Sequence, residues 1–525
     1  MKKAVMLPLV AAISGAMVGC GGGGGGGGTT APSPTVYTIS FVKLERDLGK
    51  NIPSNCAIYG EYQQPEIVSS MLNAMNATDE KTYVYGVVAD SNFNILIHDE
   101  NGNVTDKTSY RPNSNGQISL NMSSVPTNGF LTVEEESGTT VEDLSVHSLS
   151  IHRDLLQNMT IAVRNNQSAS NRCVTASGDD LFRSAELDET AATNVVVVGT
   201  TQGYLANGSR LGEIASHTNS ARDIPVVSKN PNDQKVLLTA YAQSTESSTD
   251  SGMSLSLTGM NGFAFVDSKS IYFDGNSSNA IPVTLDEVGA PSVNFNHSGL
   301  KAFDGGQVVV QNDGDLYKWQ PIYGDSTSYA YADTAPVQKW ALDVEGTTTN
   351  GWNYNGVYTL DGTAINFSAP THGSSSSLTV STCGNSGFGY CFSQASFDTS
   401  YKLARYQVRT YTSTSIPRPF SQTIYSVAGT QQPMMKPSNN NVDINFTPGS
   451  DIVEVSMLAS ASTSKDTGQF FMTNHSDYAK MTELYDFQAD EFVDYTGIVP
   501  LFTQAVKSYS NVMNSDVSQV QGSTR

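Results

Sequence analysis

Apolar and polar residues alternate along much of the chain, and this period of two predicts β-strands. In the clearest runs the apolar positions are Ile118, Leu120, Met122, Leu131 and Val133. Asn-Gly dipeptides flank these runs at residues 101–102, 115–116 and 128–129. Because Asn-Gly supplies the positive φ that tight hairpin turns require, the pattern predicts an antiparallel meander within residues 36–165.

A longer β-rich region is predicted for residues 194–475. Three of its segments share one order, which is an apolar strand, a turn with an aspartate, and a strand with an aromatic residue. The turn aspartates are Asp267, Asp313 and Asp361, with spacings of 46 and 48 residues. Such spacings are typical of β-propeller blades, although stacked β-sandwiches would contain the same strands. Both architectures remain open for this region.

Helical spacing occurs in two short segments. Pro500 is followed by apolar residues with i, i+4, i+7 spacing at Phe502, Val506 and Tyr509. This spacing predicts a helix within a helical C-terminal segment, residues 476–525. A second short helix is predicted within residues 66–77, and the polar residues 166–193 are predicted to form a linker. The predicted fold class is therefore all-β with a C-terminal helix.

The first twenty residues have the pattern of a targeting segment. Two lysines precede an apolar stretch, residues 4–18, that is too short to span about 30 Å of hydrocarbon and fits a secretory signal peptide. The tetrapeptide Met-Val-Gly-Cys that ends at Cys20 resembles the lipobox of bacterial lipoproteins, with Met in place of the commoner Leu. That resemblance implies removal of residues 1–19 and acylation of Cys20. It also implies transport to the outer membrane, because Gly21 is not an aspartate.

Eight glycines and a Thr, Ser and Pro-rich stretch follow this cysteine, so residues 20–35 are predicted to form a lipidated tether. More than one acyl chain gives stable anchoring in a bilayer. The turn spacing in residues 36–165 resembles that of transthyretin-like sandwiches, which implies a small N-terminal β-sandwich. The glycine run and the composition resemble those of surface lipoproteins of marine Gram-negative bacteria, including lipoproteins of the flagellar sheath.

Charge and cysteine content narrow the classes of partner and of site. The chain has 50 acidic and 29 basic residues, and this excess of negative charge disfavours nucleic acid as a partner. Besides Cys20, four cysteines remain, and an even number in an exported chain predicts two disulfides. Of the three possible pairings, we favour Cys383 with Cys391 and Cys56 with Cys173. No cofactor and no metal centre are predicted, because the seven histidines are scattered and Cys-x-x-Cys is absent from the sequence.

Tryptophans gather in one stretch of the longer region. Trp319, Trp340 and Trp352 lie within 34 residues, with several tyrosines between them. Exposed aromatic side chains form contact surfaces for sugars and for proteins, so these three residues are the candidate binding site. The alternative is that they belong to the core, because alternate residues of a strand are usually buried.

No catalytic residue is predicted. The loop around Ser386 resembles the nucleophile loop of trypsin-like proteases, but Asn385 stands where that family has an aspartate. Two turns, residues 99–103 and 312–315, are rich in oxygen-bearing side chains. Neither turn completes a calcium-binding loop, and Asn and Asp favour turns for conformational reasons alone.

The sequence predicts a lipoprotein anchored in the outer membrane, with its domains in the periplasm or on the cell surface. We expect a structural or binding role, as an adhesin, a sheath component or a coat component, with a glycan or an envelope protein as partner. One alternative is a polysaccharide-active enzyme on a β-propeller, which would need two convergent carboxylates. Another alternative is a periplasmic scaffold for envelope assembly.

Overall fold

The computed structural model describes most of the chain after residue 34. The described residues are 35–62, 82–89, 92–138, 140, 144–164, 169–176, 195–198, 203–207, 214–217, 220–221, 235–243, 257–267, 281–284, 291–370, 372–447, 451–460, 464–473, 486–487 and 496–524. The predicted signal peptide, the tether up to residue 34 and the predicted helix at 66–77 lie outside the described residues.

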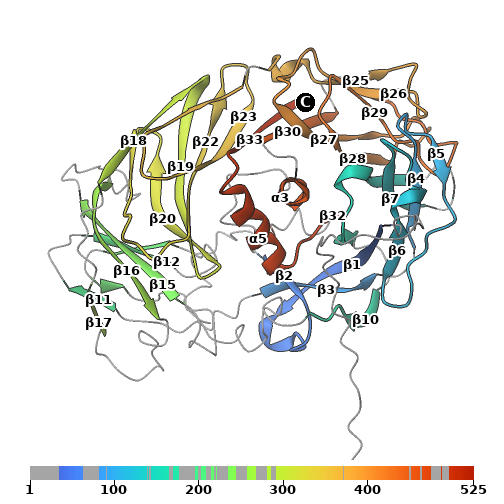
Figure 1. Ribbon diagram of the computed structural model, residues 1–525. Helices are drawn as coiled ribbons and strands as arrows, with labels where there is room; N and C mark the ends of the chain where they lie inside the picture. Colours follow the sequence, from blue (N-terminus) through green and yellow to red (C-terminus); the bar gives the residue numbers. More distant parts are fainter. Residues whose placement is uncertain are drawn as a thin grey trace, which may run out of the picture.

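Two large sheets form the body of the protein (Figure 1). The twelve-stranded sheet has the order β20 (Asp315–Tyr323), β19 (Leu300–Asn312), β22 (Lys339–Thr348), β23 (Asn353–Thr359), β33 (Val517–Thr524), β30 (Ile452–Ser460), β27 (Tyr401–Tyr411), β28 (Pro419–Val427), β8 (Ser145–His152), β7 (Phe130–Ser137), β4 (Asn94–His98) and β5 (Val104–Asp106). The eight-stranded sheet has the order β31 (Asp486–Phe487), β2 (Ile58–Tyr62), β3 (Thr82–Ala89), β1 (Val36–Leu48), β9 (Met159–Val163) and β32 (Gly497–Ile498), with β10 (Ala169–Cys173) paired to β3 and β6 (Gln117–Asn121) paired to β1.

Four smaller sheets and short helices complete the described elements. The smaller sheets are β14 (Ser220–Ala221), β11 (Val195–Val198) and β17 (Ile281–Thr284); β13 (Ile214–His217), β12 (Gly203–Asn207), β15 (Lys235–Gln243) and β16 (Leu257–Asp267); β21 (Ser328–Ala330), β18 (Ser292–Ser298) and β24 (Ile365–Ser368); and β25 (Thr379–Thr382), β26 (Tyr390–Ser393) and β29 (Gln431–Pro433). The helices are α3 (Lys465–Thr473), α5 (Phe502–Val512), and the 3₁₀ turns η1 (Gly49–Asn51), η2 (Met122–Ser124), η3 (Arg153–Leu155) and η6 (Ser375–Ser377). The structure is therefore all-β with a C-terminal helix, as the sequence predicts.

The twelve-stranded sheet curves around α3 and α5, and we call the face toward these helices its inner face (Figure 1). One core joins the inner face to both helices and to the eight-stranded sheet; its members include Val309, Leu458, Phe470, Tyr509 and Ile39. A second core covers the outer face and includes residues of the smaller sheets, among them Phe263, Phe295 and Phe392. Because both faces are covered, its central strands can carry apolar residues at successive positions.

Strand β22 illustrates this double burial. Trp340, Leu342 and Val344 belong to the outer core, whereas Ala341 belongs to the inner core. Asp343 lies two residues after Ala341, and alternate side chains of a strand point to the same face, so Asp343 also lies on the inner face. Asp343 is only 4% exposed. The strand therefore places the buried Asp343 on the face toward the helices and three apolar residues against the outer layer.

The C-terminal strand β33 occupies an interior position in the twelve-stranded sheet. It pairs antiparallel with β23 on one side and with β30 on the other. Its register sets Val520 opposite Tyr354 and Met457, and all three side chains are buried in the outer core. The last strand of the chain thus joins β20, β19, β22 and β23 to the rest of the sheet.

The sheets do not follow the predicted domain boundaries. Strand β8 pairs in parallel with β28, with Val146 opposite Phe420, so the predicted domain 36–165 shares a sheet with the predicted domain 194–475. Strand β10 lies inside the predicted linker 166–193 and pairs with β3. The predicted division is therefore wrong for the described strands, because pairing between distant segments leaves no local composition change.

Of the two architectures that the sequence leaves open for the longer region, the described strands do not form a β-propeller. Strands β19 and β20 do form a hairpin around Asp313, but β24 pairs in parallel with β18 and not with β23 across Asp361. Strands from the second and third segments lie in one twelve-stranded sheet and not in separate four-stranded blades. The spacing of the aspartates reflects turns of similar chemistry and not a structural repeat.

The predicted meander forms only in part. All three predicted turns have positive φ, at Gly102, Gly116 and Asn128. Strand β4 pairs with β5 and β7, but β6 leaves that sheet and pairs with β1. The N-terminal strands therefore form two packed layers, as expected of a sandwich, and each layer belongs to one of the large sheets.

Candidate functional site

Both disulfides have the pairing that the sequence favours. Cys56 is bonded to Cys173, which ends β10, and Cys383 is bonded to Cys391. The first bond joins the end of β10 to the segment before β2, and the backbone N–H of Val174 donates to the carbonyl of Gly86 in β3 at 2.8 Å. Cys20, the candidate lipidation site, lies outside the described residues.

The loop closed by the second disulfide packs on the turn at residues 99–103. The backbone N–H of Gly387 donates to the carbonyl of Asn101 at 2.7 Å. The hydroxyl of Ser386 donates to the carbonyl of Met434 at 3.2 Å and accepts a hydrogen bond from the N–H of Phe388. These contacts give Ser386 a role in the turn, and both of these partners are backbone groups and not a histidine.

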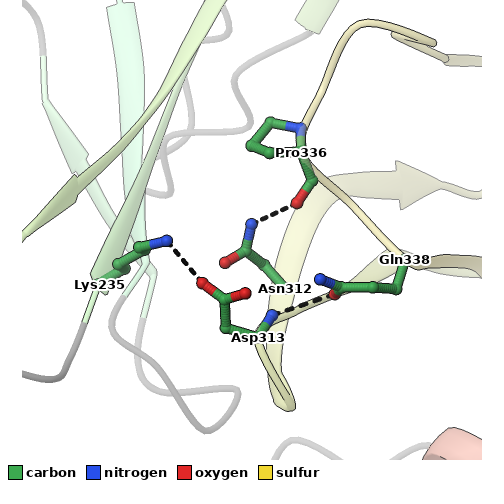
Figure 2. Close-up of polar contacts among 5 residues, drawn as sticks. All are labelled: Lys235, Asn312, Asp313, Pro336 and Gln338. Atoms are coloured by element: carbon green, nitrogen blue, oxygen red, sulfur yellow. Dashed lines mark hydrogen bonds and ion pairs between the residues drawn. The ribbon is translucent and has the colours of Figure 1, made fainter.

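The oxygen-rich turns are stabilised by hydrogen bonds within the chain. Asp99 accepts hydrogen bonds from the backbone of Asn101 and from Asn103. Figure 2 shows the second turn, where the carboxylate of Asp313 lies 2.6 Å from the ammonium of Lys235 in β15. In the described part of the chain, no three His, Cys, Asp or Glu side chains gather where they could hold a metal ion.

The turn at Asp313 links the four-stranded sheet to the twelve-stranded sheet (Figure 2). The backbone N–H of Asp313 donates to the side chain of Gln338 at 3.0 Å, and the Asn312 amide donates to the carbonyl of Pro336. The hydrogen bond and charge of Lys235 hold the pKa of the Asp313 carboxyl below its usual range. The aspartate of this predicted repeat is therefore one partner of an ion pair between sheets.

The three tryptophans are not a binding surface. Trp319 is 0%, Trp340 7% and Trp352 1% exposed, and all three belong to the outer core. The indole N–H of Trp319 donates to the carbonyl of Ala330, and that of Trp352 to the carbonyl of Gly373. The prediction of an aromatic contact surface is wrong here, because the smaller sheets and loops cover the strands that carry these residues.

Exposed apolar side chains occur instead at the end of the β27–β28 hairpin. We call residues 411–419 the hairpin tip. Tyr411 and Ile416 are each 54% exposed, and Pro417 and Pro419 are also exposed. Arg409 is exposed on the same strand as Tyr411, two residues before it, so both side chains lie on one face. In the sequence, the one sign of this exposed turn is the dipeptide Ile416-Pro417 within a stretch rich in Ser and Thr.

Hydrogen bonds fix the hairpin tip in one conformation. The N–H of Thr412 donates to the carbonyl of Arg418 at 2.9 Å. The neighbouring loop braces the tip from outside, because Ser413 N–H donates to the carbonyl of Asp443 and Asn445 N–H donates to the carbonyl of Tyr411. A braced tip loses little conformational entropy on binding a partner.

Polar side chains also lie on the inner face of the twelve-stranded sheet. Arg405 and Glu454 form a mostly buried ion pair with an N–O distance of 2.8 Å. Burial raises the pKa of the Asp343 carboxyl well above its usual range, and the nearby Glu345 raises it further. Burial likewise raises the pKa of the Tyr509 hydroxyl, with a further contribution from Asp343.

The outer face carries a second buried polar group around Glu134. Its carboxylate accepts the backbone N–H of Ser438 at 3.1 Å, while Glu136 accepts the Ser438 hydroxyl at 3.0 Å. Burial raises the pKa of Glu134 to about 7, and Glu136 adds to that rise. These contacts attach the segment after β29 to strand β7, so the two carboxylates have structural partners.

No protein-family model and no curated protein sequence matches the chain. Among solved structures, the chain has a match to one described as a Ca²⁺-stabilized adhesin that helps an Antarctic bacterium reach out and bind ice. The identity is 10%, the match covers 72% of this chain and 89% of the other, and the TM-score is 0.11. A TM-score this low does not show a shared fold. Among the described helices, none combines the length and apolarity that a membrane crossing needs.

Proposed function

We propose that the chain is an outer-membrane lipoprotein with a binding role at the cell surface, and that the hairpin tip is its contact surface. The lipobox-like tetrapeptide ending at Cys20 and the following glycines support the anchor. Two disulfides support export, since disulfides persist in oxidising compartments.

The exposed, braced hairpin tip is the observation that carries the binding role. A tyrosine and an isoleucine at 54% exposure on one short turn offer apolar area, and Arg409 beside them offers a charged donor. Tyrosine and arginine are enriched among the residues that dominate binding energy at interfaces. An anionic glycan or an acidic envelope protein matches this combination, and adhesion, sheath or coat roles all require such a contact.

The anchor is tested by metabolic labelling with an alkyne palmitate, in cells that express the wild type or Cys20→Ala. We expect label only in the wild type, and equal label in both would overturn the lipoprotein proposal. Protease treatment of intact and of ruptured cells then locates the chain. Digestion in intact cells supports a surface position, whereas protection until rupture would place the chain in the periplasm and favour an envelope-assembly role.

The contact surface is tested on a printed glycan array and on intact outer-membrane vesicles. The double variant Tyr411→Ala, Ile416→Ser removes the exposed apolar area, and Tyr323→Ala is the matched control, because Tyr323 is also exposed but lies elsewhere. We expect about a tenfold or greater loss of binding for the double variant and none for the control. Equal binding by both variants would exclude the hairpin tip as the contact.

A further inference from the structure

The inner face has a group of buried oxygen atoms beneath α5 that the hydrophobic core does not explain. Asp343 lies there with its carboxyl buried, and Gln307 donates a hydrogen bond to it. Among the described residues, the charged group that acts on Asp343 is Glu345, another acid. Two carboxylates on one face of one strand, two residues apart, lie about 7 Å from each other along the strand. Asp343 therefore has a second acidic side chain beside it on the same face of the strand.

The strand register adds amide oxygens to the same row. Glu345 lies directly opposite Asn355 in β23, and Asn355 lies directly opposite Gln519 in β33. Directly paired residues have Cβ atoms about 4.5–5.5 Å apart. Asn355 lies two residues before Val357, and Gln519 lies two residues after Val517. Both valines belong to the inner core, and alternate side chains of a strand point to the same face, so the row faces α5.

Two atoms at this place have no hydrogen-bond partner. They are the hydroxyl oxygen of Tyr509 in α5 and the amide oxygen Oε1 of Gln519. Tyr509 is 0% and Gln519 2% exposed, so neither atom is satisfied by bulk water. Asp343 contributes to the raised pKa of the Tyr509 hydroxyl, so the two side chains are close enough to interact electrostatically. Buried polar groups without partners are rare and call for a bound water, ion or ligand.

We propose that this row binds a divalent cation of the Ca²⁺ class, with Asp343, Glu345 and Gln519 as its protein ligands. Every donor in the row is oxygen, which Ca²⁺ prefers, and the row has none of the nitrogen or sulfur ligands typical of Zn²⁺. Ca²⁺ takes 6–8 oxygens in flexible geometry, so Asn355, Tyr509 and water can complete the shell around two carboxylates. The cation neutralises the buried Asp343 and fixes α5 and β33 to β22.

The test uses the full chain purified in detergent, stripped with EDTA, and titrated with Tb³⁺ and with Ca²⁺. Tyr509 sensitises Tb³⁺ emission when the ion binds beneath it, and Ca²⁺ should displace that ion. We expect Ca²⁺ to raise the melting temperature of the stripped wild type. Asp343→Asn should weaken Ca²⁺ binding at least about 100-fold, since even outer-shell partners of a metal contribute 10–100-fold. Asp333→Asn, at an exposed position, is the matched control and should bind as the wild type does.

Three results would overturn the proposal. The first is the absence of Tb³⁺ emission and of any Ca²⁺ effect in the wild type, which would mean that Asp343 is protonated and water fills the row. The second is unchanged binding in Asp343→Asn, which would locate the cation elsewhere. If Asp343→Asn does not fold, Tyr509→Phe replaces it, because this variant keeps the ring packing. Retention of most of the tyrosine-sensitised Tb³⁺ emission in Tyr509→Phe is the third result.

Discussion

Deleting the C-terminal strand should prevent the native fold, although it removes only the last residues of the chain. A stop codon after Ser515 removes β33 and leaves β23 and β30 as two open strand edges inside the twelve-stranded sheet. Unpaired edges bind other strands, so the truncated chain should also aggregate. A terminal strand at the edge of a sheet would be far less costly to remove.

The magnitude follows from what β33 buries. Val517 and Val520 are each 0% exposed, and full burial of a valine contributes about 1.5–3 kcal/mol, so the pair contributes about 3–6 kcal/mol. The ladders to β23 and β30 add about 0.5–1.5 kcal/mol for each net hydrogen bond. Together these losses equal or exceed the stability of about 5–15 kcal/mol that native proteins have.

A graded version of the test uses point variants in the same strand. Val520→Ala removes two buried methyl groups and leaves a cavity, so we expect a loss of about 2–3 kcal/mol. Ser523→Ala is the control, because Ser523 is exposed and such changes stay within about 0.5 kcal/mol. Urea unfolding followed by tryptophan fluorescence reports directly on the strand, since Trp352 packs against Gly522. A truncated chain that unfolds cooperatively at the wild-type midpoint would refute the reasoning.

Three further predictions rest on single features of the structure. Loss of the Cys56–Cys173 disulfide, whose sequence separation is 117, should lower the free energy of unfolding by up to about 4.9 kcal/mol through loop entropy. Loss of the other disulfide, with a separation of 8, should lower it by up to about 2.5 kcal/mol. Urea unfolding midpoints of the paired Cys→Ser variants measure both losses. Because burial raises the pKa of Glu134 from 4.5 to about 7, the folded state retains a proton that the unfolded chain has lost. Stability should therefore fall by up to about 3 kcal/mol as pH rises through that interval, and Glu134→Gln should flatten the fall in thermal melts. Gly306→Ala should lower the free energy of unfolding in urea by on the order of 3 kcal/mol or more, because φ is +146° and a Cβ would meet the Asp343 carbonyl. Gly314→Ala is the control and should lower it by only about 1–2 kcal/mol, because φ is +94° but the space around Gly314 is open.

Local chemistry explains what the sequence predicted correctly. Tight hairpin turns require positive φ, which Asn and Gly adopt at a lower energetic cost than most other residues. Asn128 and Gly102 have positive φ here. The helix after Pro500 is α5, which begins at Phe502 and buries Tyr509. The disulfide pairing was predictable because one pair closes a short loop and leaves one partner for each remaining cysteine.

Long-range pairing explains what the sequence did not predict. Nothing near Val146 indicates that its strand will pair with the strand of Phe420, more than 270 residues later. The same limit applies to the site: the aromatic pattern around Trp340 is the same for an exposed strand as for one covered by a second layer. The hairpin tip was missed because exposure of Tyr411 depends on the absence of such a cover over that turn.

The position of β1 in its sheet determines how the folded part would resist a force applied through the proposed tether. If Cys20 is anchored in a bilayer, any force on the folded part enters at Val36, the first residue of β1. Strand β1 is interior: it pairs antiparallel with β6 and β3, and in parallel with β9. A pull along β1 therefore loads the hydrogen bonds of several neighbouring strands in shear, whereas an edge strand held on one side would open bond by bond. An anchor at this strand suits a protein that must hold a bound partner while attached to a membrane.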